Sequence, residues 1–305
     1  MENPQAARAA PMIDGVSASC VGLPAGPWTR LLDFLAQRMP GVPREVWFER
    51  MAQGRVFNEA GATLAPAAPF EPHTRVYYYR ELSNEPRIPF EETVLYQDEH
   101  LVVADKPHFL PVTPAGRYLQ ETLLVRLKRQ LGLEHLAPIH RIDRETAGLV
   151  LFGVQPSERG MYHALFSQRN VSKQYEAIAP WREDLALPQV RASRIEPDAQ
   201  FFRQREVPGE ANSETRIELL EVRGALARYR LTPLSGKTHQ LRVHMNALGV
   251  PILGDLLYPE VVHGPAHVEE NFALPLQLLA RTLTFVDPVS GQSRRFESQR
   301  RLDWP

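Results

Sequence analysis

The sequence predicts an α+β protein with a large mixed, mainly antiparallel sheet flanked by helices, and a small α/β module at the N-terminus. Two observations predict this class. Short apolar runs typical of strands, such as residues 101–106 and 149–152, alternate irregularly with helical patterns instead of forming a regular strand–helix repeat. A polar stretch that contains two prolines, residues 83–92, separates these runs from an earlier group of elements.

The composition along the chain divides it into four segments. Residues 1–26 are rich in Ala, Pro and Gly without periodicity, so we expect a flexible N-terminus. Residues 27–82 are predicted to form the small module, and residues 83–92 a linker. Residues 93–305 are predicted to form the large domain, which is long enough to enclose a substantial hydrophobic core.

Local signals place the individual elements. In the small module the apolar spacing predicts two helices and then two strands, at residues 31–40, 44–53, 54–58 and 75–79. In the large domain it predicts a buried strand, a helix closed by a glycine, a second buried strand and two more helices, at residues 101–106, 121–131, 149–152, 158–167 and 239–248. Thr238 is the expected N-cap of the last helix.

The composition excludes several classes of protein. No run approaches the ~20 apolar residues that span a bilayer, and the N-terminus lacks the charged start and apolar core of a secretory signal. A single cysteine, Cys20, excludes an intrachain disulfide framework and a cysteine-based zinc site. We therefore expect a cytoplasmic protein without a bound metal.

The charge is distributed unevenly along the chain. The net charge of −1 argues against a protein that is basic over its whole surface, as many nucleic-acid-binding proteins are. Residues 224–245, however, contain four arginines or lysines and two histidines without any acidic residue. A local basic surface is therefore expected on a neutral protein.

The most informative segment is residues 140–152, which read HRIDRETAGLVLF. It places Asp143 between Arg141 and Arg144, just ahead of the apolar run of a buried strand. Neighbouring guanidinium groups stabilise the ionised form of a carboxylate, and a carboxylate held at the end of a rigid strand can act as a nucleophile. An isolated Asp–Arg dipeptide, by contrast, is most often a structural ion pair.

The whole string resembles the H-R-L-D-R-x-T-S-G-L-L-L motif of the RluA-type pseudouridine synthases, in which this aspartate is the catalytic nucleophile. Ile142 and Ala147 differ from the motif, and neither alters a charged group. The resemblance implies that residues 93–305 are the catalytic domain of an enzyme that isomerises uridine in RNA to pseudouridine. It also implies that no cofactor is needed, because the reaction has no redox or phosphate-transfer step.

Two further motifs resemble the same family. Residues 171–177, VSKQYEA, match its K-x-Y-x-A motif, whose tyrosine faces the target base. Residues 236–245, GKTHQLRVHM, are followed by LGVPILGD and match its G-R-T-H-Q-I-R-V-H-L … L-G-x-P-I-x-G-D motif. By resemblance, Arg242 pairs with the catalytic carboxylate. Tyr175 either stacks on the base or takes a ring proton, if a nearby guanidinium lowers its pKa.

RNA contacts are expected from polar residues in and around these motifs. The resemblance implies that Arg141 fills the gap left by a flipped nucleotide. The other expected RNA-contacting residues are His140, Arg144, Lys173, Lys237, His239 and Gln240. Residues 27–82 also resemble the small RNA-binding module often fused ahead of such domains, in which Arg44 and Arg55 would contribute to a basic face.

Several alternatives remain open from the sequence. Asp143 could attack the ring or the ribose, or assist formation of a glycal. The expected substrate is structured RNA, with ribosomal RNA slightly favoured over transfer RNA, and a monomer is the default state. A non-catalytic RNA-binding or ribosome-assembly protein that retains the fold is the principal alternative function. An N-glycoside hydrolase is a second alternative, which would need a further carboxylate as general acid.

Overall fold

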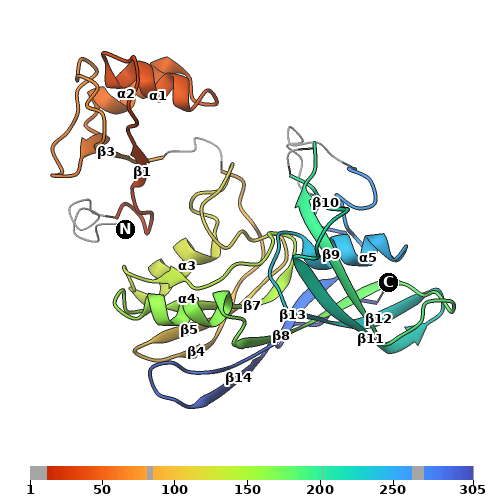
Figure 1. Ribbon diagram of the computed structural model, residues 1–305. Coiled ribbons are helices and arrows are strands. Elements are labelled where there is room, and N and C mark those ends of the chain that lie inside the picture. Colours follow the sequence, from red (N-terminus) through yellow and green to blue (C-terminus); the bar gives the residue numbers. More distant parts are fainter. Residues whose placement is uncertain (1–11, 81–84, 201, 263–270, 305) are drawn as a thin grey trace. The chain divides into compact units, whose positions relative to one another are not determined.

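The computed structural model describes residues 12–80, 85–200, 202–262 and 271–304. The chain forms two compact units (Figure 1). One comprises Met1–Glu85 and Gly116–Gln120, and the other Pro86–Ala115 and Glu121–Pro305. Within the described ranges, no helix is long and apolar enough to cross a membrane.

The N-terminal unit packs two helices on a three-stranded antiparallel sheet with the strand order β1-β3-β2. Its elements are β1 (Ser19–Gly22), α1 (Leu31–Arg38), α2 (Arg44–Ala52), β2 (Val56–Asn58) and β3 (Arg75–Tyr78). Leu35 and Trp47, both fully buried, anchor the core between the helices and the sheet. The two helices and two strands predicted for this module are confirmed.

The expectation of a flexible segment at residues 1–26 is wrong for part of its length. Residues 1–11 lie outside the described ranges, but Ser19–Gly22 forms β1, which pairs with Arg75–Tyr78. This pairing joins segments more than fifty residues apart, so local composition gave no sign of it.

The segment expected to be a linker is fixed to the large unit over its described part from residue 86 onward; residues 83 and 84 lie outside the described ranges. Ile88 is 2% exposed, and its backbone N–H donates a hydrogen bond of 2.8 Å to Glu121. The Arg126 guanidinium donates to the carbonyl oxygens of Ile88 and Phe90, at 2.8 and 2.7 Å. Arg126 belongs to helix α3 (Leu123–Leu131), so residues 86–92 lie against that helix.

The large unit is built on one eleven-stranded sheet, whose main path has the order β10-β9-β11-β12-β8-β13-β7-β5-β4, with β6 paired to β7 and β14 to β13. Its strands are β4 (Thr93–Gln97), β5 (Leu101–Lys106), β6 (Ala137–Pro138), β7 (Ala147–Gly153), β8 (Val171–Pro180), β9 (Gln189–Pro197), β10 (Gln204–Val207), β11 (Ser213–Arg223), β12 (Leu226–Pro233), β13 (Leu278–Val286) and β14 (Ser293–Glu297). Among these strands only the β7–β13 pairing is parallel. The predicted mixed, mainly antiparallel α+β fold is confirmed.

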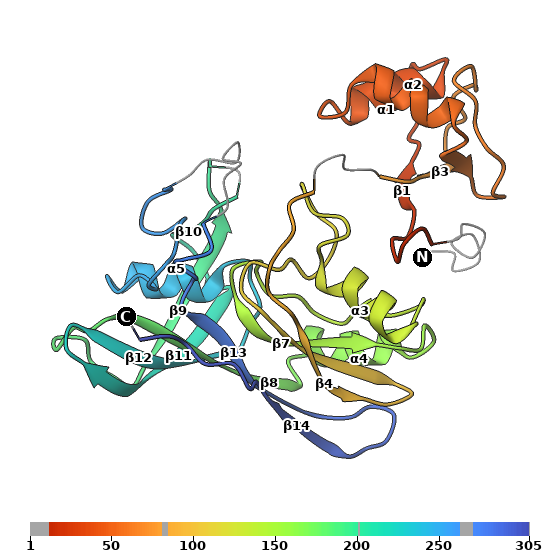
Figure 2. The same cartoon turned by 180° about the vertical axis from the view of Figure 1, so that it is seen from behind.

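Three helices accompany this sheet. Helices α3 and α4 (Arg159–Ser167) lie beside β5 and β7, whereas α5 (Gln240–Ala247) lies beside β9 and β10; both views agree (Figure 1, Figure 2). Helix α3 is closed, as expected, by Gly132 in the left-handed conformation. It begins at Leu123 and not at residue 121, and the hydroxyl of the preceding Thr122 accepts the Val125 N–H. The predicted cap of α5 is wrong. His239, not Thr238, precedes the helix, with a φ of 54° and no side-chain capping bond.

The strand that follows Asp143, β7, lies inside the sheet between β5 and β13. Every residue of Ala147–Gly153 is buried, as is every residue of the neighbouring strand Leu101–Lys106. Gly148 has a φ of 109°, and a Cβ atom there would lie 2.3 Å from the carbonyl oxygen of Ala280 on β13. Only glycine therefore allows β7 and β13 to approach closely beside the Asp143 loop.

Gly148→Ala is expected to lower the free energy of unfolding by about 2–3 kcal/mol, because the new methyl group meets backbone and the φ angle becomes strained. Chemical denaturation of the purified protein measures this change. Gly160→Ala in α4 is the control, since a Cβ atom there has no atom within 4 Å. A loss at Gly148 no larger than at Gly160 would contradict the proposed close approach.

A fully buried histidine fixes α5 to the sheet. His244 Nε2 lies 3.0 Å from the Ser193 hydroxyl and 3.1 Å from that of Ser213, and its Nδ1 lies 3.0 Å from the Thr215 hydroxyl. Burial lowers the pKa of His244 to about 4. The ring is therefore neutral at pH 7, and α5 is held by hydrogen bonds rather than by an ion pair.

The lowered pKa of His244 predicts a loss of stability in acid. His244 takes up a proton near pH 6.5 in the unfolded chain but only near pH 4 in the folded chain. The stability that the neutral ring contributes to the fold is therefore complete above pH 6.5 and falls as the pH drops toward 4. Between these two pH values the free energy of unfolding is expected to fall by about 3 kcal/mol. His244→Gln should flatten the pH dependence of the unfolding free energy by about this amount, whereas the exposed His163→Gln should leave it unchanged.

Candidate active site

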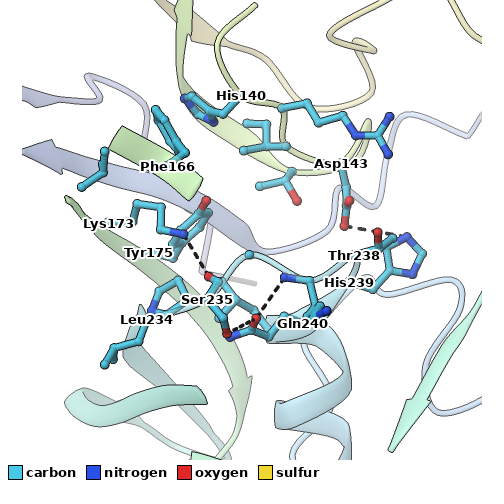
Figure 3. A pocket seen from close by; sticks show the side chains of 18 of the residues that line it. His140, Asp143, Phe166, Lys173, Tyr175, Leu234, Ser235, Thr238, His239 and Gln240 are labelled. Atoms are coloured by element: carbon cyan, nitrogen blue, oxygen red, sulfur yellow. Dashed lines mark hydrogen bonds and ion pairs between the residues drawn. The ribbon is translucent and has the colours of Figure 1, made fainter. Parts of the chain in front are cut away.

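A cavity of about 440 Å³ opens in the large unit between the loop that precedes β7, strand β8 and the N-terminal end of α5. Figure 3 shows Asp143 and Tyr175 projecting from different walls of this cavity. Nine residues predicted from the sequence line it: His140, Arg141, Asp143, Lys173, Tyr175, Lys237, His239, Gln240 and Arg242. The three motifs, far apart in the sequence, therefore meet at one site.

The loop that carries Asp143 is tied down at several points. The Asp143 carbonyl oxygen accepts the Thr146 N–H at 3.2 Å, which closes a turn before β7. The Lys106 ammonium, fully buried at the end of β5, donates to the carbonyl oxygens of Arg144 and Pro107 at 2.9 Å each. Burial lowers the pKa of Lys106 to about 7. These bonds fix the backbone on which the Asp143 carboxylate stands.

Arg242 connects two carboxylates. Its Nη1 lies 3.3 Å from Asp143 Oδ2, while its Nε and Nη2 donate to the two oxygens of Asp255 at 2.8 and 2.7 Å. Arg242 is 1% exposed. Burial alone would lower its pKa, but the hydrogen bonds and charge of Asp255, with the charge of Asp143, raise it overall. The guanidinium therefore stays charged beside Asp143.

His239 adds a neutral imidazole next to this pair. Its Nε2 lies 3.9 Å from Asp143 Oδ2, and its Nδ1 lies 3.2 Å from the Tyr258 hydroxyl. The Tyr258 hydroxyl donates its proton to the Gln204 carbonyl oxygen, so Nδ1 is the donor toward Tyr258 and Nε2 carries a lone pair. Burial lowers the pKa of His239, which keeps the ring neutral.

Tyr175 stands on β8, where it pairs with Leu231 of β12 and Ala280 of β13. Burial, and then the charge of Asp143, raise the pKa of the Tyr175 phenol. The condition under which Tyr175 was expected to take a ring proton, a pKa lowered by a guanidinium, is therefore not met. The protonated ring is suited to contact or stack on a base.

Gln240, which was expected to contact RNA, forms hydrogen bonds within the protein. Its amide oxygen accepts hydrogen bonds from the Ser235 hydroxyl and the Lys237 N–H, at 2.7 and 3.1 Å. Its amide nitrogen donates to the Glu214 carbonyl and the Thr215 hydroxyl, both at 2.9 Å. All four hydrogen-bonding positions of the amide are used, so Gln240 holds the rim loop.

His140 is likewise part of the scaffold. Its Nε2 accepts the Leu151 N–H at 3.1 Å, and its ring stacks on Phe166 with the centroids 4.6 Å apart. Burial lowers the pKa of His140 to about 3, so the ring is neutral and carries no charge toward a phosphate. Lys173 donates to the Ser235 carbonyl at 2.9 Å and so supports the same rim.

Of the remaining residues that were expected to contact RNA, some lie at the cavity and the others lie away from it. Arg141 and Lys237 have exposed side chains at the cavity. Arg144 is not part of the cavity lining and forms an ion pair of 2.9 Å with Glu145. Arg44 and Arg55 belong to the N-terminal unit, where Arg44 pairs with Asp33 at 2.9 Å.

Comparisons with known proteins agree with this geometry. Residues 100–247 match the sequence profile of the family described as RNA pseudouridylate synthase. The dual-specificity RNA pseudouridine synthase RluA of Haemophilus influenzae is 31% identical, over 71% of this chain and 96% of that protein. The chain belongs to the RluA-type RNA pseudouridine synthase family. Enzymes of this family convert uridine in RNA to pseudouridine.

Two further proteins support the assignment. An uncharacterized RNA pseudouridine synthase of Synechocystis is 31% identical, over 79% of this chain and 81% of that protein. The structure of human RNA pseudouridylate synthase domain containing 1 superimposes with a TM-score of 0.56 at 22% identity, covering 71% of this chain and 86% of that chain. At this identity the human structure supports the fold of the large unit.

Sequence reasoning gave no role to two residues of the site. Asp255 closes the third motif, but its double hydrogen bond to Arg242 depends on a turn that the sequence pattern does not describe. Phe166, at the end of α4, stacks on His140. Its apolar character signals burial in general and gives no indication of a position at the cavity.

Proposed function

We propose that this chain converts specific uridines of structured RNA to pseudouridine, with Asp143 as the nucleophile. The observation that supports this most is the pair of Asp143 and the buried Arg242 inside a cavity that also contains Tyr175. In the reaction the bond from ribose C1′ to N1 breaks, the uracil turns, and C1′ bonds to C5. C5 then loses its proton and N1 gains one, so neither an oxidant nor a phosphate donor is needed.

Different residues of the cavity would extrude the nucleotide, contact the base and carry out the reaction. Unstacking the target nucleotide costs a few kcal/mol, and the exposed Arg141 guanidinium is suited to occupy the vacated position in the RNA. Tyr175 contacts the flipped base as a neutral phenol. Asp143 is 26% exposed and so remains accessible to the nucleotide while Arg242 stabilises its charge.

Ribosomal RNA is the RNA class that we favour. A small module precedes the large unit, and the part of it that follows β1, two helices and then two strands, is similar in order to RNA-binding modules fused ahead of such domains. Such a module would allow binding to a large folded RNA at a second position. The cytoplasmic location and the monomeric state stay predictions.

A pseudouridine map of total RNA tests this proposal. The gene is deleted in its source organism and then restored as the wild type. Loss of one or a few pseudouridines in ribosomal RNA, with recovery on complementation, is the expected result. Loss confined to transfer RNA would contradict the favoured RNA class, and an unchanged map would contradict the enzyme assignment.

A further inference from the structure

We infer that Asp255 is a positioning residue, which fixes the orientation of Arg242 and limits the charge that Arg242 exerts on Asp143. This inference rests on the proposed function, since it concerns the same carboxylate. It assigns a role to a residue outside the lining of the cavity.

The geometry of Arg242 is unequal toward its two carboxylates. Asp255 receives two hydrogen bonds, of 2.8 and 2.7 Å, in the parallel arrangement that matches a guanidinium edge. Asp143 receives one long contact of 3.3 Å from the remaining nitrogen. The closest ion pair of Arg242 is therefore with Asp255, and its electrostatic interaction with Asp143 is the weaker of the two.

Asp255 is itself held rigidly. Its side chain is fully buried, and its Oδ1 also accepts the backbone N–H groups of Leu257 and Tyr258 at 2.9 and 3.1 Å. The preceding Gly254 has a φ of 77°, and a Cβ atom there would lie 2.4 Å from the Pro275 carbonyl oxygen. The turn that presents Asp255 thus depends on glycine, and the two backbone hydrogen bonds fix the orientation of the carboxylate.

This arrangement has a chemical consequence. If Arg242 were paired with Asp143 alone, the guanidinium would bind the carboxylate through two short bonds and reduce its reactivity as a nucleophile. With Asp255 in place, the plane of the guanidinium is fixed and Asp143 keeps lone pairs for the nucleotide. Asp255 does not need to touch the RNA to have this effect.

Other polar groups also lie around Asp143 and must stay unchanged in a test. They are the charged Arg242 guanidinium and the neutral His239 ring at α5, the protonated Tyr175 phenol on β8, and Lys106 on β5. A substitution at Asp255 leaves all four in the protein. A change in kcat would therefore report the loss of the Asp255 carboxylate.

The substitution Asp255→Asn removes the charge and keeps the size and one acceptor oxygen. We expect kcat to fall by up to about a hundredfold, because Arg242 loses its orientation, with KM little changed. Both are measured by pseudouridine formation in an RNA that the wild type modifies.

Asp287→Asn is the matched control. Asp287 is also fully buried, accepts the N–H groups of Val289 and Ser290, and pairs with Arg294 at 3.3 Å, but it does not line the cavity. A kcat for Asp255→Asn equal to that of Asp287→Asn would overturn the inference. Wild-type turnover in the same assay separates this outcome from a failure of the proposed function.

If Asp255→Asn does not fold, Asp255→Glu tests the positioning role of Asp255 instead. It keeps the charge and displaces the carboxylate by one methylene. The inference predicts a lowered kcat with KM little changed. A wild-type kcat for Asp255→Glu would contradict it.

Discussion

Asp143→Asn should fold like the wild type and form no detectable pseudouridine, a loss of at least about a thousandfold in kcat. The amide cannot act as the nucleophile, and it keeps the size of the side chain. Asp143 is 26% exposed, and among the described residues it pairs with the charged Arg242, while the neutral ring of His239 lies 3.9 Å away. Because Arg242 retains Asp255, the substitution does not leave a buried guanidinium unpaired.

Single-turnover kinetics with excess enzyme measure this loss, and the thermal unfolding midpoint checks the fold. Asp287→Asn, whose carboxylate lies outside the cavity lining, should retain wild-type turnover. Turnover by Asp143→Asn within tenfold of the wild type would exclude Asp143 as the nucleophile. RNA binding by both proteins without turnover by either would favour the non-catalytic alternative.

Arg242→Met should lower the free energy of unfolding by about 3–5 kcal/mol and abolish turnover. The methionine fills much of the space of the aliphatic stem but leaves the fully buried Asp255 carboxylate without its cation. Two backbone N–H groups remain as its partners, which do not replace a guanidinium. The stability loss therefore comes mainly from an uncompensated buried charge.

Urea denaturation compares this variant with Arg295→Met, which breaks the exposed pair of Arg295 and Glu297 and should cost no more than about 1 kcal/mol. The double variant Arg242→Met with Asp255→Asn should recover part of the stability, because the unpaired buried carboxylate of Asp255 is then replaced by a neutral amide. A loss at Arg242 as small as that at Arg295 would show that Asp255 does not depend on the guanidinium.

Three residues predicted as catalytic, Asp143, Tyr175 and Arg242, line one cavity in the structure. Each belongs to a motif that forms or adjoins a regular element: Asp143 lies in the loop before β7, Tyr175 within β8 and Arg242 in the first turn of α5. Strand Ala147–Gly153 is buried throughout, as its continuous apolar run predicts. Local pattern was sufficient for these positions because the elements themselves carry the side chains to the cavity.

Other features of the structure depend on contacts that the sequence does not show. The polar amide of Gln240 resembles an RNA-contacting group in the sequence, yet all of its hydrogen bonds are made within the protein. The Thr238 cap failed because His239 adopts a left-handed conformation. The strand Ser19–Gly22 is formed by pairing with distant residues. Asp255 gains its role from a turn stabilised by contact with another loop.

Tritium release from uracil C5 reports directly whether this protein forms pseudouridine. RNA from a strain that lacks the gene is labelled with tritium at uracil C5 and incubated with the purified protein. Pseudouridine formation must release that tritium to water, because C5 exchanges its hydrogen for the ribose carbon. The account predicts release by the wild type, none by Asp143→Asn, and no free uracil. Absence of release would contradict the enzyme assignment, and labelled free uracil would indicate an N-glycoside hydrolase instead.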